Sequence, residues 1–208
     1  TLEGACDTIR REYEVGLRAG VTVQPYVPAG TPAPEWAELG GSLDWSAVHL
    51  YQDAKATPAL AQFPQTAHAV GAVDLARIDG TPMEVFFSRL RPGAHIPPHH
   101  GLTNTRVTVH LPLIVPEGCA IRVGRDLCHW REGTIIAFDD SFEHEAWNRS
   151  GADRVVLIFE AHHPDLSPPE RAAIEHVYSV RQRWLDARLA RLQAWQATAA
   201  AGADNSVQ

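Results

Sequence analysis

The segment TIIAFDDSFEHEAWNRSGADRVVLIFEA, residues 134–161, decides the fold class. It holds short runs of β-branched and aromatic residues separated by Asp, Ser, Asn and Gly, which is the pattern of β-strands joined by turns. Runs of the same character precede it along the chain. The predicted strands cover 84–90, 106–115, 119–123, 134–138, 143–147 and 154–161. Short strands at this spacing are typical of a β-sandwich or barrel.

The region before these strands has a mixed character. Residues 1–20 place apolar side chains among charged ones and predict a helix, whereas 24–42 are rich in Pro and Gly and predict an irregular covering arm. The Asp-Trp-Ser triplet at 44–46 is interpreted as the N-cap of a helical segment, and the Phe-Pro pair at 63–64 as the end of a segment.

The region after the strands predicts a long amphipathic helix. Ser167 and Pro168 supply an N-cap and a first-turn proline, and apolar residues then recur near a 3.6-residue period. This helix either braces the β core or forms a homodimer interface, for which its two tryptophans are suitable anchors. The expected layout is one domain, 1–208, made of a covering region at 1–82, a catalytic β core at 83–166, a helix at 167–198 and a tail at 199–208.

Composition restricts the class of partner and the compartment. With 208 residues and 45% hydrophobic content, the chain can bury one substantial core. Its net charge of −7 argues against a nucleic-acid partner, which needs a basic surface. No apolar run reaches the roughly 20 residues of a membrane span, and three cysteines without a CxxC pair favour the reducing cytoplasm. Only Lys55 among the 18 basic residues is lysine, a bias typical of GC-rich bacterial genomes.

Two histidine segments carry the candidate chemistry, GAHIPPHHG at 93–101 and DDSFEHE at 139–145. Iron(II) in oxygenases is commonly bound by two histidines and one carboxylate on one face of an octahedron. His99 and His144 are the candidate ligands, and since they are far apart in the chain, only a β fold that closes on itself can join them. The carboxylate of the usual pattern lies two residues after the first histidine, where this chain has Gly101.

Acidic residues near His144 offer a substitute for the missing ligand. Glu143 and Glu145 should point to the face of a regular strand opposite to His144. Asp140 is the acid whose position, an even number of residues from His144, would place it on the same face as that histidine. The alternative is a site completed by water, in which Asp139 and Asp140 satisfy turn amides or orient a metal-bound water. The sequence favours the two-histidine site with water over a hidden carboxylate.

Arg154 adds a second candidate group. The Asn-Arg-Ser-Gly segment at 148–151 is interpreted as a turn that folds 143–147 back on 154–160 as a hairpin, which would place His144 opposite residue 154 or 155. Cross-strand neighbours lie about 5 Å apart at Cβ, so Arg154 would hold one end of an acid whose other end reaches a metal on His144. A surface ion pair is the alternative role for this arginine.

A wider set of residues resembles the aspartyl/asparaginyl β-hydroxylase family, densely over 85–166. The shared positions are Phe87-Ser88, Pro92-Gly93, His95, Pro98-His99, Gly101, Thr103-Asn104, Arg106, His110, Gly118-Cys119, Ile121-Arg122, Trp130, Gly133, 138–145, Trp147, Arg154 and His163-Pro164. The resemblance implies a mainly β fold, a double-stranded β-helix (jelly roll, cupin-like) with flanking N-terminal helices and a long C-terminal helix. It also implies iron(II), 2-oxoglutarate and O2, with glycine in place of the acidic ligand.

The same resemblance implies roles for individual residues. His99 and His144 would bind the metal, and together with Arg154 they would be the catalytic residues. Arg154 and Ser88 would bind the distal carboxylate of 2-oxoglutarate, and His110 would contact this co-substrate near the metal.

Three further positions are candidate substrate residues. Thr108 stands where the animal enzyme of the family is expected to have an arginine, and Phe86 replaces a lysine. Arg106 is retained, either as a cation that pairs with an anionic substrate or as a structural ion pair. The loss of two cations argues against a simple transfer of aspartate specificity.

The resulting prediction is a hydroxylase that acts on an unactivated carbon and releases succinate and CO2. Its substrate would be an amino acid, an aspartyl- or asparaginyl-like residue, a peptide or a natural-product intermediate, free or bound to a carrier. The competing class is a non-catalytic or isomerase-type metal-binding cupin. Arg154 and Ser88 discriminate between the two, because only a user of 2-oxoglutarate needs that carboxylate clamp.

Overall fold

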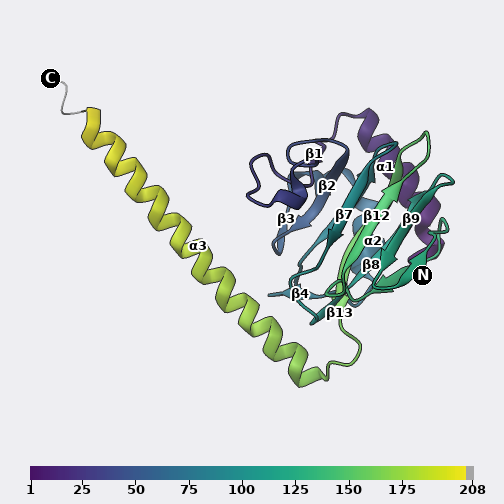
Figure 1. The fold of residues 1–208 in the computed structure, drawn as a ribbon. Coiled ribbons are helices and arrows are strands. Elements are labelled where there is room, and N and C mark those ends of the chain that lie inside the picture. The colour runs from purple at the N-terminus through teal and green to yellow at the C-terminus, as the bar shows by residue number, and fades with distance from the viewer. Residues whose placement is uncertain (205–208) are drawn as a thin grey trace. The chain divides into compact units, whose positions relative to one another are not determined.

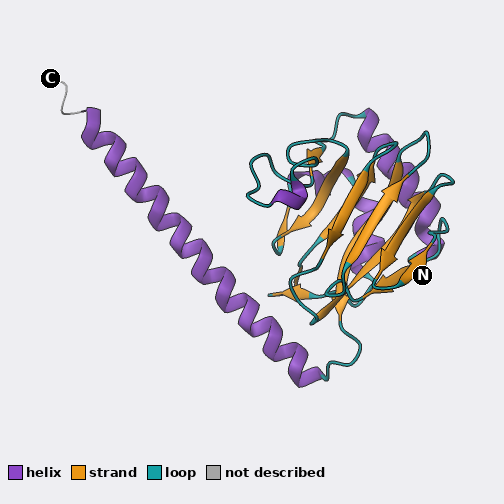
Figure 2. Ribbon diagram, viewed as in Figure 1, coloured by secondary structure: helices purple, strands orange, loops and turns teal. Residues whose placement is uncertain are grey.

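The computed structural model describes residues 1–204, and side chains as far as residue 196. The chain divides into two compact units between Leu166 and Ser167 (Figure 1). The first unit consists of β-sheets with helices, and the second is a single helix (Figure 2). This division falls at residue 166, where the β core was expected to end, and the expected single domain stays a prediction.

The first unit is built from antiparallel sheets. A seven-stranded sheet has the order β1-β2-β6-β13-β8-β11 with β3 paired to β2, a four-stranded sheet has the order β10-β9-β12-β7, and β4 pairs with β5. The larger sheet comprises β1 (Gln24–Pro25), β2 (Trp45–Gln52), β3 (Lys55–Ala56), β6 (Val85–Leu90), β8 (Arg106–Ile114), β11 (Ile136–Phe138) and β13 (Arg154–His162). The others are β7 (His95–His99), β9 (Cys119–Val123), β10 (Asp126–Cys128), β12 (His144–Asn148), β4 (Arg77–Ile78) and β5 (Thr81–Pro82). This architecture confirms the predicted mainly β, double-stranded fold.

Helices precede most of the strands. The predicted N-terminal helix is confirmed as α1, and the arm at 24–42 is mostly irregular, as predicted. The helical elements of this unit are α1 (Cys6–Arg18), α2 (Pro64–Gly71) and the 3-10 turns η1 (Glu3–Ala5), η2 (Pro34–Trp36) and η3 (Pro58–Gln62). The Phe-Pro pair at 63–64 separates η3 from α2, so it ends one segment and also begins the next.

The larger sheet is buried on both faces. Successive side chains of a strand point to opposite faces, so the residues of β13 divide between two hydrophobic clusters. Leu157 packs in the cluster that contains Ile9 of α1, whereas Val156 packs in the cluster that contains Ile96 and Ile121 of the smaller sheet. Helices α1 and α2 therefore cover one face of the larger sheet, and the smaller sheet covers the other. The candidate site lies in the layer between the two sheets.

The prediction of a helix N-cap at 44–46 is wrong. Trp45 begins β2, which pairs with β6 through Trp45 opposite Leu90. The strand form is favoured because it buries side chains on both faces, Leu50 against the helices and Ala47 in the layer between the sheets. Ser46, the supposed capping residue, is buried and accepts a hydrogen bond from Arg89. The larger sheet therefore includes β1 and β2, both of which precede residue 83, where the β core was expected to begin.

The predicted hairpin of 143–147 with 154–160 is also wrong. The turn at 148–151 exists, but β12 pairs with β7 and β9 whereas β13 pairs with β6 and β8. The turn therefore carries the chain from one sheet to the other. Asn148, which is buried, holds this crossing by donating from Nδ2 to the carbonyl oxygens of Leu90 and Ala152.

The second unit is α3 (Pro168–Asp204), which is longer than the predicted helix at 167–198. Its predicted start is confirmed, because Glu170 accepts hydrogen bonds from the backbone N–H and the hydroxyl of Ser167. Residues 199–204 continue the helix and do not form the predicted tail, whose remainder lies outside the described residues. Core bracing and dimer formation by α3 both stay predictions. Among the residues described, no helix combines the length and apolar character that crossing a bilayer requires.

Candidate active site

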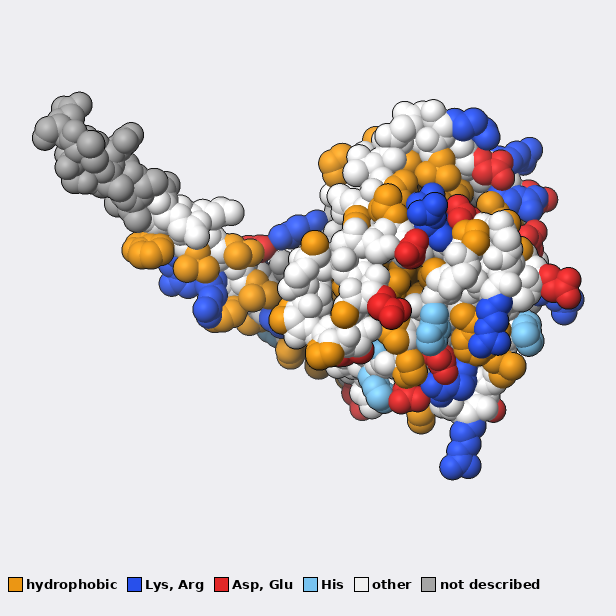
Figure 3. Space-filling view, turned by 45° about the horizontal axis from the view of Figure 1, so that its top comes forward, with side chains coloured by type: hydrophobic (Ala, Val, Ile, Leu, Met, Phe, Trp, Pro, Cys, Tyr) orange, Lys and Arg blue, Asp and Glu red, His pale blue; other side chains and the backbone are white. Residues whose placement is uncertain are grey.

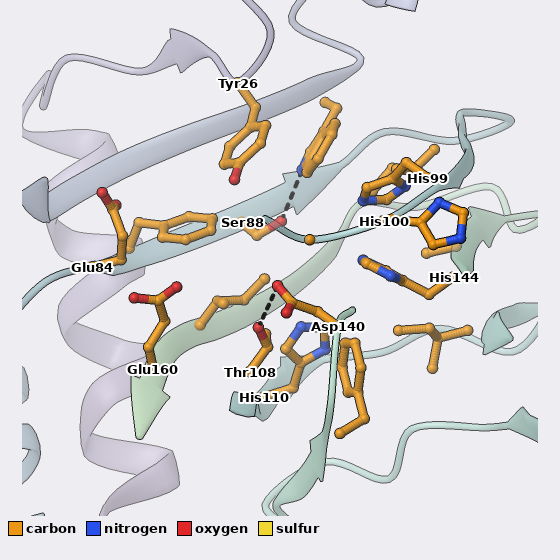
Figure 4. Close-up of a pocket in the computed structure, with 18 of the residues that line it drawn as sticks. Tyr26, Glu84, Ser88, His99, His100, Thr108, His110, Asp140, His144 and Glu160 are labelled. Carbon is orange, nitrogen blue, oxygen red and sulfur yellow. Dashed lines mark hydrogen bonds between the residues drawn. The ribbon is translucent and has the colours of Figure 1, made fainter. Parts of the chain in front are cut away.

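A cavity of about 320 Å³ lies between the two sheets of the first unit. Both sheets contribute to its wall, and every site residue predicted from the sequence lines it. The larger sheet provides Phe86, Ser88, Arg106, Thr108, His110, Arg154, Ile158 and Glu160, and the smaller sheet with its loops provides Ile96, His99, His100, Gly101, Ile121, Asp140, His144 and Ala146 (Figure 4). The even-numbered positions of β6, β8 and β13 face the cavity because strand side chains alternate between the faces.

His99 and His144 are direct partners in the ladder between β7 and β12. Their ring centroids lie 4.0 Å apart, and a register shift follows His144 along β12. The Nδ1 atom of His99 lies 2.8 Å from the carbonyl oxygen of Pro97, and Nδ1 of His144 lies 3.0 Å from that of Phe142. A carbonyl oxygen only accepts, so each Nδ1 carries the proton and each Nε2 keeps a lone pair. This is the tautomer that binds a metal through Nε2.

The charge state of His99 suits the same role. Burial, followed by the neighbouring His144, lowers the pKa of His99 to about 4. The ring is therefore neutral at pH 7 and able to donate its lone pair to a metal. Within the described part of the chain, no group of three or more His, Cys, Asp or Glu side chains is arranged to hold a metal ion. The histidine pair therefore has no protein carboxylate in ligand geometry beside it.

Asp140 occupies the space that a side chain at residue 101 would need. A Cβ atom at Gly101 would lie 2.3 Å from Cγ of Asp140 and 2.4 Å from both of its carboxylate oxygens. The Asp140 carboxylate accepts a hydrogen bond from Thr108 Oγ1 at 3.1 Å, and its backbone oxygen accepts one from the Gly101 N–H at 2.7 Å. Burial raises the pKa of Asp140. The acid beside the histidines thus comes from the loop before β12.

Glu143 and Glu145 lie on the other face of the smaller sheet, as the strand parity predicts. Both accept hydrogen bonds from Arg122, and Glu145 also contacts His95 Nε2 at 2.8 Å. Neither lines the cavity. They are therefore not candidates for the missing metal ligand.

Arg154 is a cation in the interior of the sandwich, with 1% of its surface exposed. Its Nη1 donates to Ser88 Oγ at 3.4 Å, and the same hydroxyl accepts a hydrogen bond from Trp45 Nε1 at 3.1 Å. The guanidinium carbon lies 4.9 Å from the centre of the Trp130 ring. Among the described residues no ion pair joins Arg154 to a carboxylate, and its Nε has no hydrogen-bond partner. A buried cation without an anion is costly, so this geometry favours an anionic ligand in the cavity.

His110 is fully buried next to Arg154. Its Nδ1 accepts a hydrogen bond from Trp130 Nε1 at 3.2 Å, so the proton of the neutral ring is on Nε2. Burial, with Arg154 adding to it, holds the pKa of His110 well below its usual value. His110 is therefore a neutral hydrogen-bond donor beside the buried cation. Arg154 lines the same cavity as His99 and His144 from the opposite sheet, and not from the other strand of a hairpin as predicted.

The other side of the cavity contains residues that the sequence reasoning missed. Figure 4 shows Tyr26, Glu84 and Glu160 on one side of the cavity and His99, His100 and His144 on the other. Strand parity was the available signal. Glu84 directly precedes β6 and has the same parity as Ser88, and Glu160 shares the face of Arg154 on β13. Tyr26, Trp36 and Trp45 come from the N-terminal segments, where no local pattern indicated a cavity.

The three predicted substrate residues lie at this part of the wall. Phe86 and Thr108 both line the cavity, and Thr108 binds Asp140. Arg106 Nε lies 3.1 Å from Glu160 Oε2, so the structural ion pair left open by the sequence is present.

Comparison with known proteins finds a matching family model and several relatives. A family model described as aspartyl/asparaginyl β-hydroxylase matches residues 3–164. The human aspartyl/asparaginyl β-hydroxylase is 33% identical over 153 residues, which cover 68% of this chain and 19% of that protein. The ornithine lipid ester-linked acyl 2-hydroxylase of Rhizobium tropici is 48% identical over 85 residues, which cover 39% of this chain and 30% of that protein.

A solved structure titled as a sugar phosphate isomerase from a cupin superfamily, from Silicibacter pomeroyi, aligns with 71% of this chain and 74% of its own at a TM-score of 0.43 and 15% identity. The matched segments make up 19% of the human protein and 30% of the Rhizobium protein, so this chain spans a minor part of the length of these two relatives. The family match itself covers the α1 helix, both sheets and every residue of the candidate site. The chain belongs to the aspartyl/asparaginyl β-hydroxylase family.

Proposed function

We propose that the protein is an iron(II)- and 2-oxoglutarate-dependent hydroxylase that acts on an unactivated carbon of a small molecule or peptide. The observation that carries the proposal is Arg154, a buried cation without an anion that lines the same cavity as two histidines with free Nε2 lone pairs. Such an arrangement suits a ligand with an acid at one end and metal-chelating oxygens at the other.

The donor set fits iron(II). His99 and His144 would hold the metal through Nε2, because their Nδ1 protons are bound to backbone oxygens. With 2-oxoglutarate and dioxygen, bound iron(II) supplies the oxidising chemistry that inserts one oxygen atom into a C–H bond and converts 2-oxoglutarate to succinate and CO2. Asp140 lies where the missing ligand would be and would accept a hydrogen bond from a water that completes the site.

The co-substrate would lie between the metal and Arg154. The planar guanidinium binds a carboxylate through two parallel charge-assisted hydrogen bonds, and Ser88 Oγ, which already contacts Nη1, would add a third. His110 would donate from Nε2 to an oxygen of the same molecule. Trp45 and Trp130 hold Ser88 and Arg154 in place and keep water away from the buried charge.

A non-catalytic metal-binding cupin would leave the buried charge of Arg154 without a counter-ion, whereas the distal carboxylate of 2-oxoglutarate would supply one. The geometry therefore favours the hydroxylase over that alternative. The family membership points in the same direction, because the human and Rhizobium relatives are both named as hydroxylases.

The test is spectroscopic. Anaerobic addition of iron(II) and 2-oxoglutarate to the protein is expected to give a weak visible charge-transfer band, which neither component gives alone. His144→Ala should abolish the band, and Arg154→Lys should raise the 2-oxoglutarate concentration needed to form it by about tenfold or more. The matched controls are His68→Ala and Arg125→Lys, both at exposed positions. A wild-type protein without the band, or a band that survives in His144→Ala, would contradict the proposal.

A further inference from the structure

One end of the cavity has an excess of negative charge. The charged lining residues other than histidine are three acids, Glu84, Asp140 and Glu160, and two arginines, Arg106 and Arg154. Arg154 belongs to the co-substrate in the proposed function, and Arg106 is already paired with Glu160. Glu84 and Asp140 therefore have no arginine of their own, Glu84 at the same end of the cavity as Glu160 and Asp140 nearer the histidines (Figure 4).

The acids lie close enough to influence one another. Burial is the main cause that raises the pKa of Glu160 to about 7, and the negative charges of Glu84 and Asp140 raise it further, although Arg106 opposes this. Glu84 accepts a hydrogen bond from the backbone N–H of Asp53, and His49 Nδ1 lies 3.6 Å from its carboxylate. An additional cation in this part of the cavity would relieve the repulsion among the three acids.

Aromatic rings form the wall between the acids and the histidines. Tyr26 stacks on Trp45 with ring centroids 3.9 Å apart, and its centroid lies 5.3 Å from that of Phe86. Trp36 lies beside Trp45 and also contacts the ring of His99. Ring faces attract cations, most strongly when water is excluded. A cavity with acids at its end and aromatic rings along its wall matches a cationic ligand in two independent ways.

From this arrangement we infer that the substrate carries a protonated amine or a guanidinium, which binds between Glu84 and Glu160 at the end of the cavity opposite to the histidine pair. The inference rests on the proposed function, since it assigns the other end of the cavity to the metal and 2-oxoglutarate. A substrate carboxylate would meet like charges there, and the neutral Phe86 and Thr108 offer it no counter-charge. Arg106 acts as a positioning residue that holds Glu160 in the wall.

Four probes of matched shape separate charge from size, namely the N-acetyl amides of lysine, arginine, norleucine and glutamate. Calorimetric titration is made on the metal-free protein with 2-oxoglutarate and on the anaerobic iron(II) complex. The lysine and arginine probes are expected to bind at least about tenfold more tightly than the norleucine probe, since a hydrogen bond to a charged group is worth roughly that factor. The glutamate probe should bind most weakly.

Variants of Glu84 and Glu160 test whether these two acids bind the cationic group of the probes. Glu84→Gln and Glu160→Gln should each weaken the lysine and arginine probes about tenfold and leave the norleucine probe unchanged. Glu117→Gln, at an exposed position of the β8–β9 loop, is the matched control and should change nothing. The unfolding midpoint of each variant is measured to check that it folds. If loss of the ion pair with Arg106 unfolds Glu160→Gln, the result for Glu84→Gln decides the test.

The inference is overturned if the glutamate probe binds as tightly as the cationic probes, if neither cationic probe binds at millimolar concentration, or if both variants keep wild-type affinities. These outcomes are distinct from failure of the proposed function. A normal visible band with iron(II) and 2-oxoglutarate, together with preference for the glutamate probe, would contradict the cationic substrate alone. An absent band with tight binding of the cationic probes would contradict the hydroxylase proposal alone.

Discussion

Gly101 decides what lies beside the histidine pair. Gly101 stands where the usual pattern of iron oxygenases has an acid, and the packing shows what fills that space instead. The Asp140 carboxylate fills the volume next to the Gly101 Cα, at distances that no real Cβ contact shows. Residue 101 and residue 140 therefore cannot both present a side chain to this space. The acid beside the histidine pair therefore lies on the loop that precedes His144, and not two residues after His99.

This exclusion predicts the behaviour of Gly101→Ala. The added methyl group should displace the Asp140 carboxylate, at a small cost in stability because Asp140 is a short side chain with a rotatable end. Iron(II) affinity should fall about 10- to 100-fold, which is the usual effect of losing a group that orients a metal site. Anaerobic iron(II) titration of the wild type, Gly101→Ala, Asp140→Ala and the double variant measures this.

The double variant supplies the sharp comparison. If both single changes act by removing the same carboxylate, the double variant should be no worse than Asp140→Ala alone. Gly151→Ala, where a Cβ atom would meet nothing within 4 Å, is the control and should bind iron(II) normally. Additive losses in the double variant would show that Gly101 acts by another route.

Helix α1 packs against the larger sheet through a close approach at one glycine. Ile9, Tyr13 and Gly16 are buried at helical spacing, and Gly16 lies against the ring of Phe63, which has no exposed surface. A Cβ atom at Gly16 would lie 2.6 Å from Cζ of Phe63. The ring of Phe63 thus limits the size of the side chain that position 16 can hold. Phe63 itself directly precedes α2.

Two opposing magnitudes decide the effect of Gly16→Ala. Alanine gains about 1 kcal/mol of helix propensity over glycine, but overpacking against a buried ring costs roughly 1–3 kcal/mol. The free energy of unfolding, measured by urea denaturation, should therefore fall by up to about 2 kcal/mol. The control is Gly71→Ala at the last residue of α2, which has open space around it and should be neutral or slightly stabilising. Equal stability of the two variants would mean that the Phe63 ring moves aside freely.

The molecule as a whole carries a net charge of −7, and part of this negative charge lies inside. Over the face of the first unit in Figure 3, Lys and Arg side chains lie scattered among acidic and apolar ones. The cavity is different, because its acids share a poorly hydrated space, and Glu160 shows the consequence. Its pKa in the folded protein is raised from 4.5 to about 7, so folding increases its affinity for a proton.

This shift predicts how stability changes with pH. The proton on Glu160 stabilises the folded state fully below about pH 4.5, and this contribution is lost as the pH rises through about 7. Glutamine mimics the protonated acid and does not titrate. Over this pH range, the free energy of unfolding of Glu160→Gln should therefore fall by up to about 3 kcal/mol less than that of the wild type. Denaturation of both proteins between pH 4.5 and 8, with Glu117→Gln as control, measures the difference.

The difference between the two curves is the informative quantity. The lowered pKa of His99 acts in the opposite direction, because the stability it contributes is lost as the pH falls from about 6.5 through about 4. This contribution is common to both proteins and cancels in the difference. Parallel curves would show that Glu160 does not titrate in this range.

The sequence by itself determined most of the local structure and the candidate residues of a metal site. Alternating β-branched and aromatic runs located the strands β6, β8, β9, β11, β12 and β13 to within two residues, because strand propensity and turn residues act locally. The two histidine segments and Arg154 were found from their residue types and from the family resemblance. Their chemistry is carried by side chains that can be read without knowing the fold.

The tertiary structure decided which strands became neighbours. The turn at 148–151 has hairpin chemistry, yet burial of β13 on both faces places this strand between β6 and β8 in the other sheet. The Asp-Trp-Ser triplet at 44–46 has capping chemistry, yet β2 is favoured because it also buries both faces. In each case a long-range gain in buried apolar surface outweighed a local preference of about 1 kcal/mol.

The same long-range packing decided the character of the cavity. Nothing in the local sequence says that Arg154 has no carboxylate partner among the described residues, that Asp140 fills the space beside Gly101, or that Glu84 and Glu160 lie on the same side of the cavity. These facts depend on distances between segments that meet only when the two sheets close. The residue types made a candidate metal site readable in the sequence, whereas the charges that would select its substrate became visible only once the sandwich was assembled.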